Sequence, residues 1–208
     1  MAPTPLAELM DGRTHLMPID VEQYHDLVAA GVLPEGAPYE LLDGVVVRKD
    51  RSHVGDDPMT VGHEHAMVIM RLTELGGRLK AAGAHIRAQL PVTLPPYDEP
   101  EPDGAIVVGK FEDYAERHPG ADDILCVIEV ADASLSRDRS VKARIYADSG
   151  IPQHIIVNLP DRAIEVYTEP LRGKGRYGRS ETQVPGQRVS LPVRGREFVT
   201  VPVRSLLP

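Results

Sequence analysis

Apolar residues recur at helical spacing in three parts of the chain, with polar residues between them. The first part follows Asp20, which together with Gln23 three residues later forms a capping-box pattern, and it ends at Gly31. The second contains Gly76-Gly77, a weak point near the end of a helix. The pattern predicts helices over residues 21–30, 62–83 and 137–149.

Short apolar runs lie between these helices and are typical of β-strands. The Asp43-Gly44 pair stands between a Leu-Leu and a Val-Val-Val segment within residues 39–49, which strongly favours a β-hairpin. Residues 50–61 are polar and rich in turn formers, so they predict a loop. Further strands are predicted over residues 86–94, 105–108, 124–130, 153–158 and 163–168.

The order of these elements predicts the fold class. The strands over 124–130 and 153–158 flank one helix, and a strand–helix–strand unit of this kind favours a parallel crossover. The strand over 163–168 follows a short turn and is predicted to return antiparallel. We therefore expect an α/β fold with a mixed β-sheet flanked by helices, to which the Val- and Pro-rich tail adds edge strands or a docked extension.

Length and hydropathy limit the organisation of the chain. At 208 residues and 42% hydrophobic content, one domain spanning 1–208 is expected, with residues 1–15 as a flexible N-terminal segment. No apolar run approaches the ~20 residues that a membrane span requires. The first residues also lack the basic and apolar regions of a signal peptide. These features predict a soluble cytoplasmic protein that does not contact a membrane.

Charge and cysteine content exclude some functions. The formal net charge of −8 argues against a protein that wraps nucleic acid electrostatically, because phosphate contacts need clustered Lys and Arg. A cleft in which metal ions offset carboxylates remains compatible with it. The single cysteine, Cys126, lies inside an apolar run, which favours a small core residue over a reactive thiol.

Carboxylates at the ends of predicted strands suggest a chemistry. Asp103 and Glu129 each lie where an apolar strand meets a polar loop, and Glu129 is expensive to bury without a partner or a metal. Mg²⁺ prefers such oxygen ligands, and it can activate water for phosphodiester hydrolysis. Lys142 would then orient the water or stabilise developing charge, and Glu40 would add a ligand or assist proton transfer.

The same residues also admit simpler roles. An acid beside a strand is often a helix cap or the partner of an arginine. Asp138 and Lys142 are i, i+4 neighbours, so a surface ion pair is an alternative for Lys142. His63 and His65 would suit zinc if they shared one face of a strand, but they diverge on the helix predicted there.

Several spaced motifs carry a resemblance to a known family. They are Tyr-Glu-Leu-Leu-Asp-Gly at 39–44, His65 with Val68 and Leu72 behind it, Pro102-Asp103, Val127 to Leu135, Asp138, Lys142, Tyr146-Ala147, Gly150-Ile151-Pro152 and Ile155-Ile156-Val157. In this order they resemble the Uma2 (DUF820) family of proposed restriction endonucleases. The resemblance covers about residues 20–205, and it is specific because many elements agree in sequence.

The resemblance implies a site as well as a fold. Uma2 proteins resemble the PD-(D/E)xK nuclease superfamily, which has a restriction-endonuclease-like core and a divalent-metal site. It implies Asp103, Glu129 and Glu40 as metal ligands, with Mg²⁺ or Mn²⁺ as the cofactor. Ala131 stands where the superfamily motif has its lysine, and the family pattern offers Lys142 instead. His65 is expected to line the cleft.

The function expected from the sequence is hydrolysis of DNA phosphodiester bonds by a metal-dependent endonuclease, with Glu40, Asp103, Glu129 and Lys142 as its catalytic residues. Arg139 lies on a modestly basic helix near this site and is expected to line the cleft with a phosphate contact. DNA is the expected partner, and a homodimer would suit cleavage of two antiparallel strands. Two alternatives stay open: a non-catalytic member that binds nucleic acid or protein, and a metal-dependent hydrolase of RNA or small phosphoesters.

Overall fold

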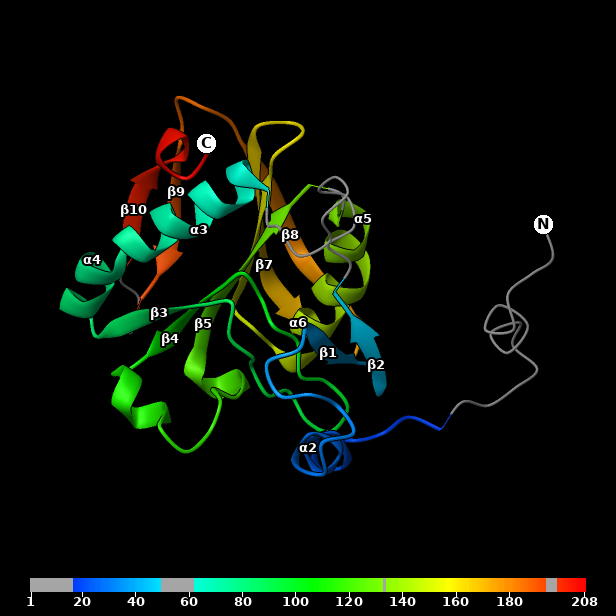
Figure 1. Cartoon of the computed structure of the whole chain (residues 1–208). Helices are drawn as coiled ribbons and strands as arrows, with labels where there is room; N and C mark the ends of the chain where they lie inside the picture. Colours follow the sequence, from blue (N-terminus) through cyan, green and yellow to red (C-terminus); the bar gives the residue numbers. More distant parts are fainter. Residues whose placement is uncertain (1–16, 50–61, 133, 194–197) are drawn as a thin grey trace.

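A mixed six-stranded sheet forms the centre of the protein in the computed structural model, which describes residues 17–49, 62–132, 134–193 and 198–208 (Figure 1). The strand order is β3-β4-β5-β6-β7-β8, with β5 and β6 parallel and the other neighbours antiparallel. The expected flexible segment 1–15 and loop 50–61 lie outside the described residues. The strands are β3 (Ala84–Ala88), β4 (Gly104–Val108), β5 (Ile124–Ala131), β6 (Gln153–Asn158), β7 (Ala163–Leu171) and β8 (Arg176–Gln183).

The helices differ from the prediction in two places. The helix expected over 62–83 is divided at Leu75, where Gly76-Gly77 follows, and the helix expected over 137–149 begins earlier and contains a π-helical turn. The elements are α2 (Val21–Ala29), α3 (His63–Glu74), α4 (Gly76–Ala81), α5 (Leu135–Arg137), the π-helical η3 (Asp138–Lys142), α6 (Ala143–Ser149) and the 3-10 turns η1 (Phe111–Tyr114), η2 (Ala121–Asp123) and η4 (Val203–Ser205).

The strand predicted over 86–94 is wrong in its second half. Strand β3 ends at Ala88, because Gln89 takes a left-handed conformation with φ of 52° and Pro91 follows. Residues 89–94 leave the sheet and run alongside the segment before β4, where the Val92 backbone N–H donates to the carbonyl of Pro100 at 3.0 Å.

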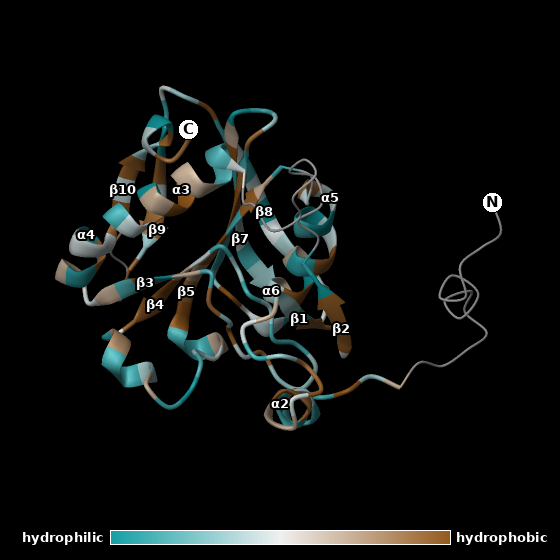
Figure 2. Ribbon diagram, viewed as in Figure 1, coloured by the Kyte–Doolittle hydropathy of each residue, from teal (hydrophilic) through white to brown (hydrophobic). Residues whose placement is uncertain are grey.

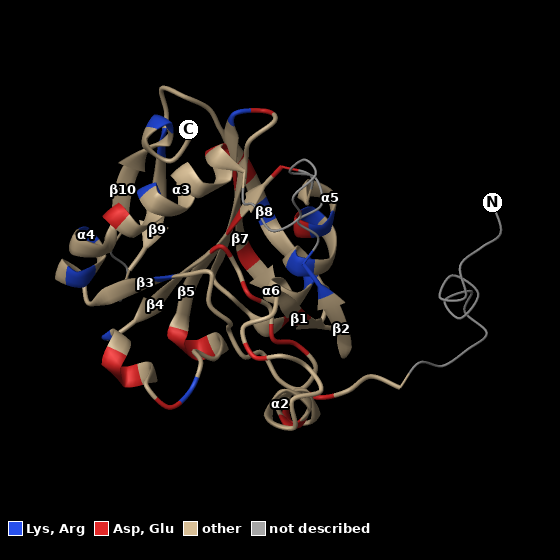
Figure 3. Cartoon of the chain, viewed as in Figure 1, with Lys and Arg blue, Asp and Glu red and all other residues tan. Residues whose placement is uncertain are grey.

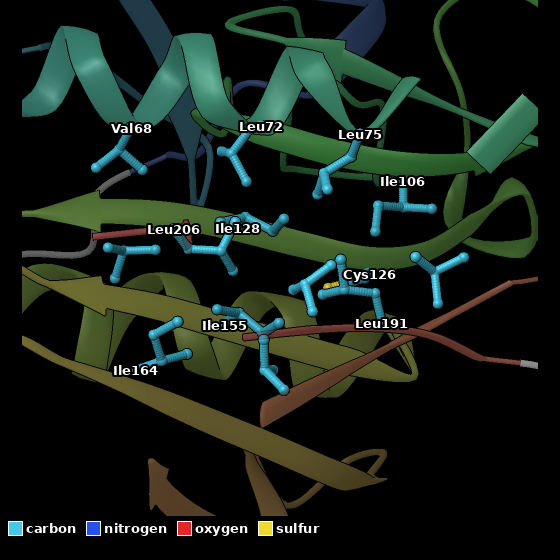
Figure 4. Close-up of a cluster of buried hydrophobic side chains, with 14 of the residues drawn as sticks. Val68, Leu72, Leu75, Ile106, Cys126, Ile128, Ile155, Ile164, Leu191 and Leu206 are labelled. Atoms are coloured by element: carbon cyan, nitrogen blue, oxygen red, sulfur yellow. The ribbon is translucent and has the colours of Figure 1, made fainter. Parts of the chain in front are cut away.

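Apolar layers cover both faces of the sheet. Figure 2 shows hydrophobic positions concentrated along β4 and β5. On one face, Leu72 of α3 and Leu191 of β9 (Arg188–Pro192) pack with Ile128 and the buried, free Cys126 (Figure 4). On the other, Tyr146 of α6 packs into a second cluster with its neighbours in the sheet. Strand β9 pairs with β10 (Phe198–Pro202), so the tail adds a separate two-stranded sheet.

A β-hairpin attaches to the edge of this core. Strands β1 (Tyr39–Leu42) and β2 (Val45–Arg48) pair antiparallel, and Asp43 and Gly44 form the turn with φ of 53° and 72°. Leu41 exchanges backbone hydrogen bonds with Glu99, at 2.8 and 3.2 Å. This bridge fixes the hairpin to the segment that leads into β4.

No helix in the described part of the chain is both long and apolar enough to cross a membrane.

Candidate active site

Glu129 stands near the end of β5 and faces the layer formed by α6. Side chains alternate along a strand, so Glu129 shares a face with Val127, while Ile128 and Val130 face the opposite layer. The Glu129 side chain is buried, and its Oε1 atom accepts hydrogen bonds from Lys142 Nζ at 3.0 Å and from the Tyr146 hydroxyl at 2.6 Å. One oxygen of this acid inside the apolar core therefore receives two donors from the helical segment that follows β5.

Lys142 joins Glu129 to a second buried carboxylate. The Lys142 side chain is 4% exposed, and its Nζ atom lies 2.9 Å from Oε1 of Glu40 on the hairpin. The Glu101 backbone N–H donates to the same Glu40 oxygen at 2.9 Å, whereas the buried Oε2 atom of Glu40 has no hydrogen-bond partner among the residues that the structure describes. The alternative of a surface ion pair between Lys142 and Asp138 is not seen, because Lys142 is buried against two other carboxylates.

Burial and charge shift the pKa values of this cluster in different directions. Burial raises the pKa of Glu129 to about 8, although Lys142 opposes the shift. Burial also works against a charged Glu40, but Lys142 and Lys49 outweigh it and lower its pKa. For Lys142, burial alone would lower the pKa, and the carboxylates of Glu129 and Glu40 reverse that effect and raise it. The ammonium and the Glu40 carboxylate thus form the charged pair.

Asp103 lies at the same end of β5. It precedes β4, and Gly104 pairs with Ile128, so the register places Asp103 opposite Glu129. Its Oδ2 atom accepts the Val130 backbone N–H at 2.9 Å, and its Oδ1 atom is 3.0 Å from His65 Nε2. Burial alone would raise the pKa of Asp103, but the hydrogen bond and charge of His65 outweigh it and lower the pKa.

The remaining predicted residues divide between this site and its surroundings. His65 contacts Asp103, whereas His63 on the same helix is exposed, so the two do not form a zinc pair. Arg139 makes a bidentate ion pair with Glu165, at 2.9 and 2.5 Å, rather than contacting the carboxylates around Lys142. Glu165 is held in addition by Asn158 at 2.8 Å.

Tyr146 is a site residue to which sequence reasoning assigned no role. It follows Lys142 by four residues, which places both on one side of the helical segment facing Glu129. That spacing was visible in the sequence, but the buried acid that both residues bind comes from a different strand. The crossover from β5 to α6 brings Lys142 and Tyr146 against Glu129, and the sequence spacing alone does not show this contact.

The donor set suits a hard divalent cation in its chemistry. Asp103, Glu129 and Glu40 supply only oxygen atoms, and one buried oxygen of Glu40 lacks a partner in the described part of the chain. Within the ranges that the structure describes, no three His, Cys, Asp or Glu side chains are grouped closely enough to hold an ion. Mg²⁺ usually takes one or two protein carboxylates and completes its shell with water and substrate phosphate, so Asp103 and Glu129 would suffice.

A large groove lies beside the carboxylates rather than over them. It has a volume of about 1240 Å³ and is lined by α2, by the segment before β1 and by residues 90–101 and 114–120. It meets the candidate site through Tyr39 and Glu101, which adjoin Glu40. Four of its lining residues are glutamates, which argues against a phosphate chain running along it.

Behind the site, His154 is buried in an aromatic cluster. Its ring centroid lies 5.5 Å from that of Tyr167, on which it stacks, and 5.2 Å from that of Tyr146 in an edge contact, and neither ring nitrogen has a hydrogen-bond partner among the described residues. Burial, with a smaller contribution from Lys142, lowers the pKa of His154 to about 3. His154 thus places a neutral imidazole in the core.

We expect His154 to make the protein sensitive to acid. Its pKa is about 3 in the fold and about 6.5 when unfolded, so the unfolded chain binds the extra proton. Above the unfolded pKa of His154, both states bind the same number of protons, so this residue does not lower the free energy of unfolding. That free energy falls by up to ~1.4 kcal/mol per pH unit below this pKa. Urea melts at pH 7 and pH 5 should show this loss in the wild type and a smaller loss in His154→Phe; equal losses would contradict the assignment.

Comparison with known proteins identifies the family. The profile of the Uma2 family, described as "Putative restriction endonuclease", matches residues 21–201. The chain belongs to the Uma2 family. A crystal structure described as "a putative nuclease belonging to DUF820 from Anabaena variabilis" superposes with a TM-score of 0.62 at 15% identity, covering 91% of this chain and 97% of that one. A comparison with curated proteins finds no match.

Membership of Uma2 agrees with the arrangement of the elements. The mixed sheet flanked by helices confirms the restriction-endonuclease-like core expected from the sequence. Glu40, Asp103, Glu129 and Lys142 are spread over about a hundred residues of sequence, and they lie around the carboxyl end of β5. The match to the Anabaena protein supports the fold alone.

Proposed function

We propose that this Uma2 protein is a divalent-metal-dependent endonuclease that hydrolyses DNA phosphodiester bonds. The observation that carries the proposal is the meeting of Glu129 and Glu40 on Lys142, with Asp103 beside them at the same strand end. Burying carboxylates and an ammonium is costly, and replacing them with apolar residues would often stabilise a fold. Their presence in a family described as "Putative restriction endonuclease" favours a chemical role.

Asp103 and Glu129 would hold Mg²⁺ or Mn²⁺, and Glu40 would add an oxygen from the hairpin side. When bound, such an ion polarises the phosphoryl group and lowers the pKa of water. Lys142, which carries its charge in this pocket, would stabilise negative charge on the reacting phosphate. His65 keeps Asp103 ionised, so the latter can bind a cation without first losing a proton.

Cleavage of a DNA pool with and without metal tests the proposal. Purified protein should nick and linearise a supercoiled plasmid in Mg²⁺ or Mn²⁺, stop in EDTA, and recover when the metal is restored. Parallel reactions with single-stranded RNA and a phosphodiester of p-nitrophenol distinguish the neighbouring substrate classes. Cleavage of RNA or of the small ester without cleavage of DNA would overturn the DNA assignment. The protein would then be a metal-dependent hydrolase of that other substrate.

We propose that one arginine contacts a substrate phosphate. The segment 137–144 carries four cations, and Figure 3 shows blue positions near α5 and α6, in the region of this segment. Lys142 binds two glutamates, Arg139 binds Glu165 and Arg144 binds Asp43. Within the described part of the chain Arg137 has no ion-pair partner, and its buried Nε atom has no hydrogen bond.

Replacing Arg137 with alanine should weaken binding of a DNA duplex and reduce the slope of log K against log salt by about 0.9, the value for one phosphate contact. The measurement is fluorescence anisotropy in Ca²⁺ or EDTA at several salt concentrations. Arg144→Ala is the matched control, because this arginine lies on the same helical segment but is already paired with Asp43. Equal effects of the two changes would remove Arg137 from the substrate-binding surface.

A non-catalytic role is the second candidate, and one observation favours it. The Lys142 ammonium already contacts Oε1 of both Glu40 and Glu129. A metal ion must therefore compete with this ammonium for the carboxylates. Titration of the protein with Mn²⁺ by calorimetry separates the two functions. A wild type that binds DNA but no Mn²⁺ would support the binding role and end the nuclease proposal.

A further inference from the structure

Tyr146 makes the shortest described contact with Glu129. Its hydroxyl donates to Oε1 of Glu129 at 2.6 Å, and the tyrosine side chain is completely buried. A buried phenol needs an acceptor, and a charged or strongly polarised oxygen makes the strongest one. Burial followed by the charge of Glu129 raises the pKa of Tyr146, which keeps the hydroxyl in its donating form.

Two donors converge on one oxygen of Glu129 and leave the other for a different partner. Lys142 and Tyr146 both bind Oε1, and within the part of the chain that the structure describes Oε2 accepts no hydrogen bond. A carboxylate held at one oxygen by two donors has a fixed rotation about its last torsion. The arrangement therefore defines where Oε2 lies.

Lys142 alone would not fix this orientation. Its ammonium is shared with Oε1 of Glu40 at 2.9 Å, and it is carried on a flexible four-carbon stem. Tyr146 has a rigid ring, and that ring is packed against His154, which in turn stacks on Tyr167. Packing in the aromatic cluster thus restricts the Tyr146 ring, and the hydrogen bond from Tyr146 restricts the Glu129 carboxylate in turn.

We propose that Tyr146 is a positioning residue that orients the Glu129 carboxylate so that Oε2 is presented to a divalent cation held jointly with Asp103. The inference rests on the proposed metal-dependent function and adds a residue to it. Tyr146 acts through Glu129 and touches neither metal nor substrate. Groups that orient a metal ligand in this way contribute roughly 10- to 100-fold to metal affinity or activity.

The test compares Tyr146→Phe with Tyr177→Phe. Both changes remove one hydroxyl from the same aromatic cluster, but the Tyr177 hydroxyl donates to the backbone carbonyl of Ile151 at 3.0 Å and does not contact Glu129. Mn²⁺ affinity is measured by calorimetry, kcat and KM by plasmid or oligonucleotide cleavage, and stability by urea unfolding. These three readouts separate positioning from a purely structural effect.

We expect Tyr146→Phe to weaken Mn²⁺ binding and lower kcat, each by roughly 10- to 100-fold, with KM for DNA within about twofold of the wild type. Tyr177→Phe should retain wild-type metal affinity and kcat, whatever its loss of stability. Wild-type Mn²⁺ affinity in Tyr146→Phe would overturn the inference, and so would equal losses in the two variants. A wild type that itself binds no Mn²⁺ is a different result, because the proposed function then fails together with the inference.

Discussion

Replacing Asp103 with asparagine is expected to lower the rate of metal-dependent DNA cleavage by about 10³-fold. Asparagine is nearly the same size, and its side-chain oxygen can still accept the Val130 N–H, so the fold is kept. The variant lacks the negative charge that would bind the cation. A metal ion supplies several kcal/mol of transition-state stabilisation, and ~4 kcal/mol corresponds to about a thousandfold in rate. Initial rates on a supercoiled plasmid in Mn²⁺ measure the effect.

Asp123→Asn is the matched control for that experiment. Asp123 lies just before the first residue of β5, whereas Asp103 lies opposite Glu129 near the last, so the two positions are separated by almost the whole strand. Its carboxylate pairs with Arg117 at 2.6 Å, and the substitution removes the same charge from the protein. The control should cleave at close to the wild-type rate. An Asp103→Asn protein that also does so, with EDTA still abolishing its activity, would place the metal at other residues.

The fold could be predicted from the sequence where local signals and tertiary packing agree. The hairpin turn at Asp43-Gly44 follows from backbone chemistry, since both residues adopt positive φ with little strain. Strand β6 begins and ends as expected because it is buried on both faces around an apolar centre and is bounded by Pro152 and Pro160. The parallel pairing of β5 with β6 follows from the helix between them.

The errors lie where tertiary contacts decide the structure. Ile86 to Leu94 alternates like one strand, yet the chain leaves the sheet after Ala88 and returns to pair with the segment before β4. Strand β8 is polar and exposed, so its hydrophobic pattern was too weak to define it. It is held by its pairing with β7 rather than by its own sequence.

The candidate site was predictable in its members but not in its connections. Glu129 was conspicuous because an acid within an apolar run needs a partner, and Asp103 followed from its position at a strand boundary. The contact of Glu40 with Lys142 joins residues from a hairpin and a crossover helix, and no local pattern encodes it. Tyr146 remained without a role for the same reason, although it stands four residues after Lys142.

Replacing Lys142 with methionine is expected to lower the free energy of unfolding by about 3–5 kcal/mol. Methionine keeps most of the length of the side chain but removes the ammonium. Glu40 and Glu129 then stay buried without their shared cation, with exposed fractions of 0% and 3%. Arg144→Met is the control, because it breaks an exposed ion pair with Asp43 and should cost less than about 1 kcal/mol. Urea unfolding at pH 8 measures both.

The pH dependence of the stability that Lys142→Met loses identifies the cause of that loss. Without the ammonium, the pKa of Glu129, which burial already raises to about 8, rises further, and Glu40 loses the main charge that lowers its pKa against the effect of burial. The fold then binds protons more tightly than the unfolded chain, and its stability falls as pH rises through that window. The loss should therefore be larger at pH 8 than at pH 5, and Glu40→Gln in the same protein should recover part of it. A loss that is the same at both pH values, or unaffected by Glu40→Gln, would mean that Lys142 supports the fold by packing alone.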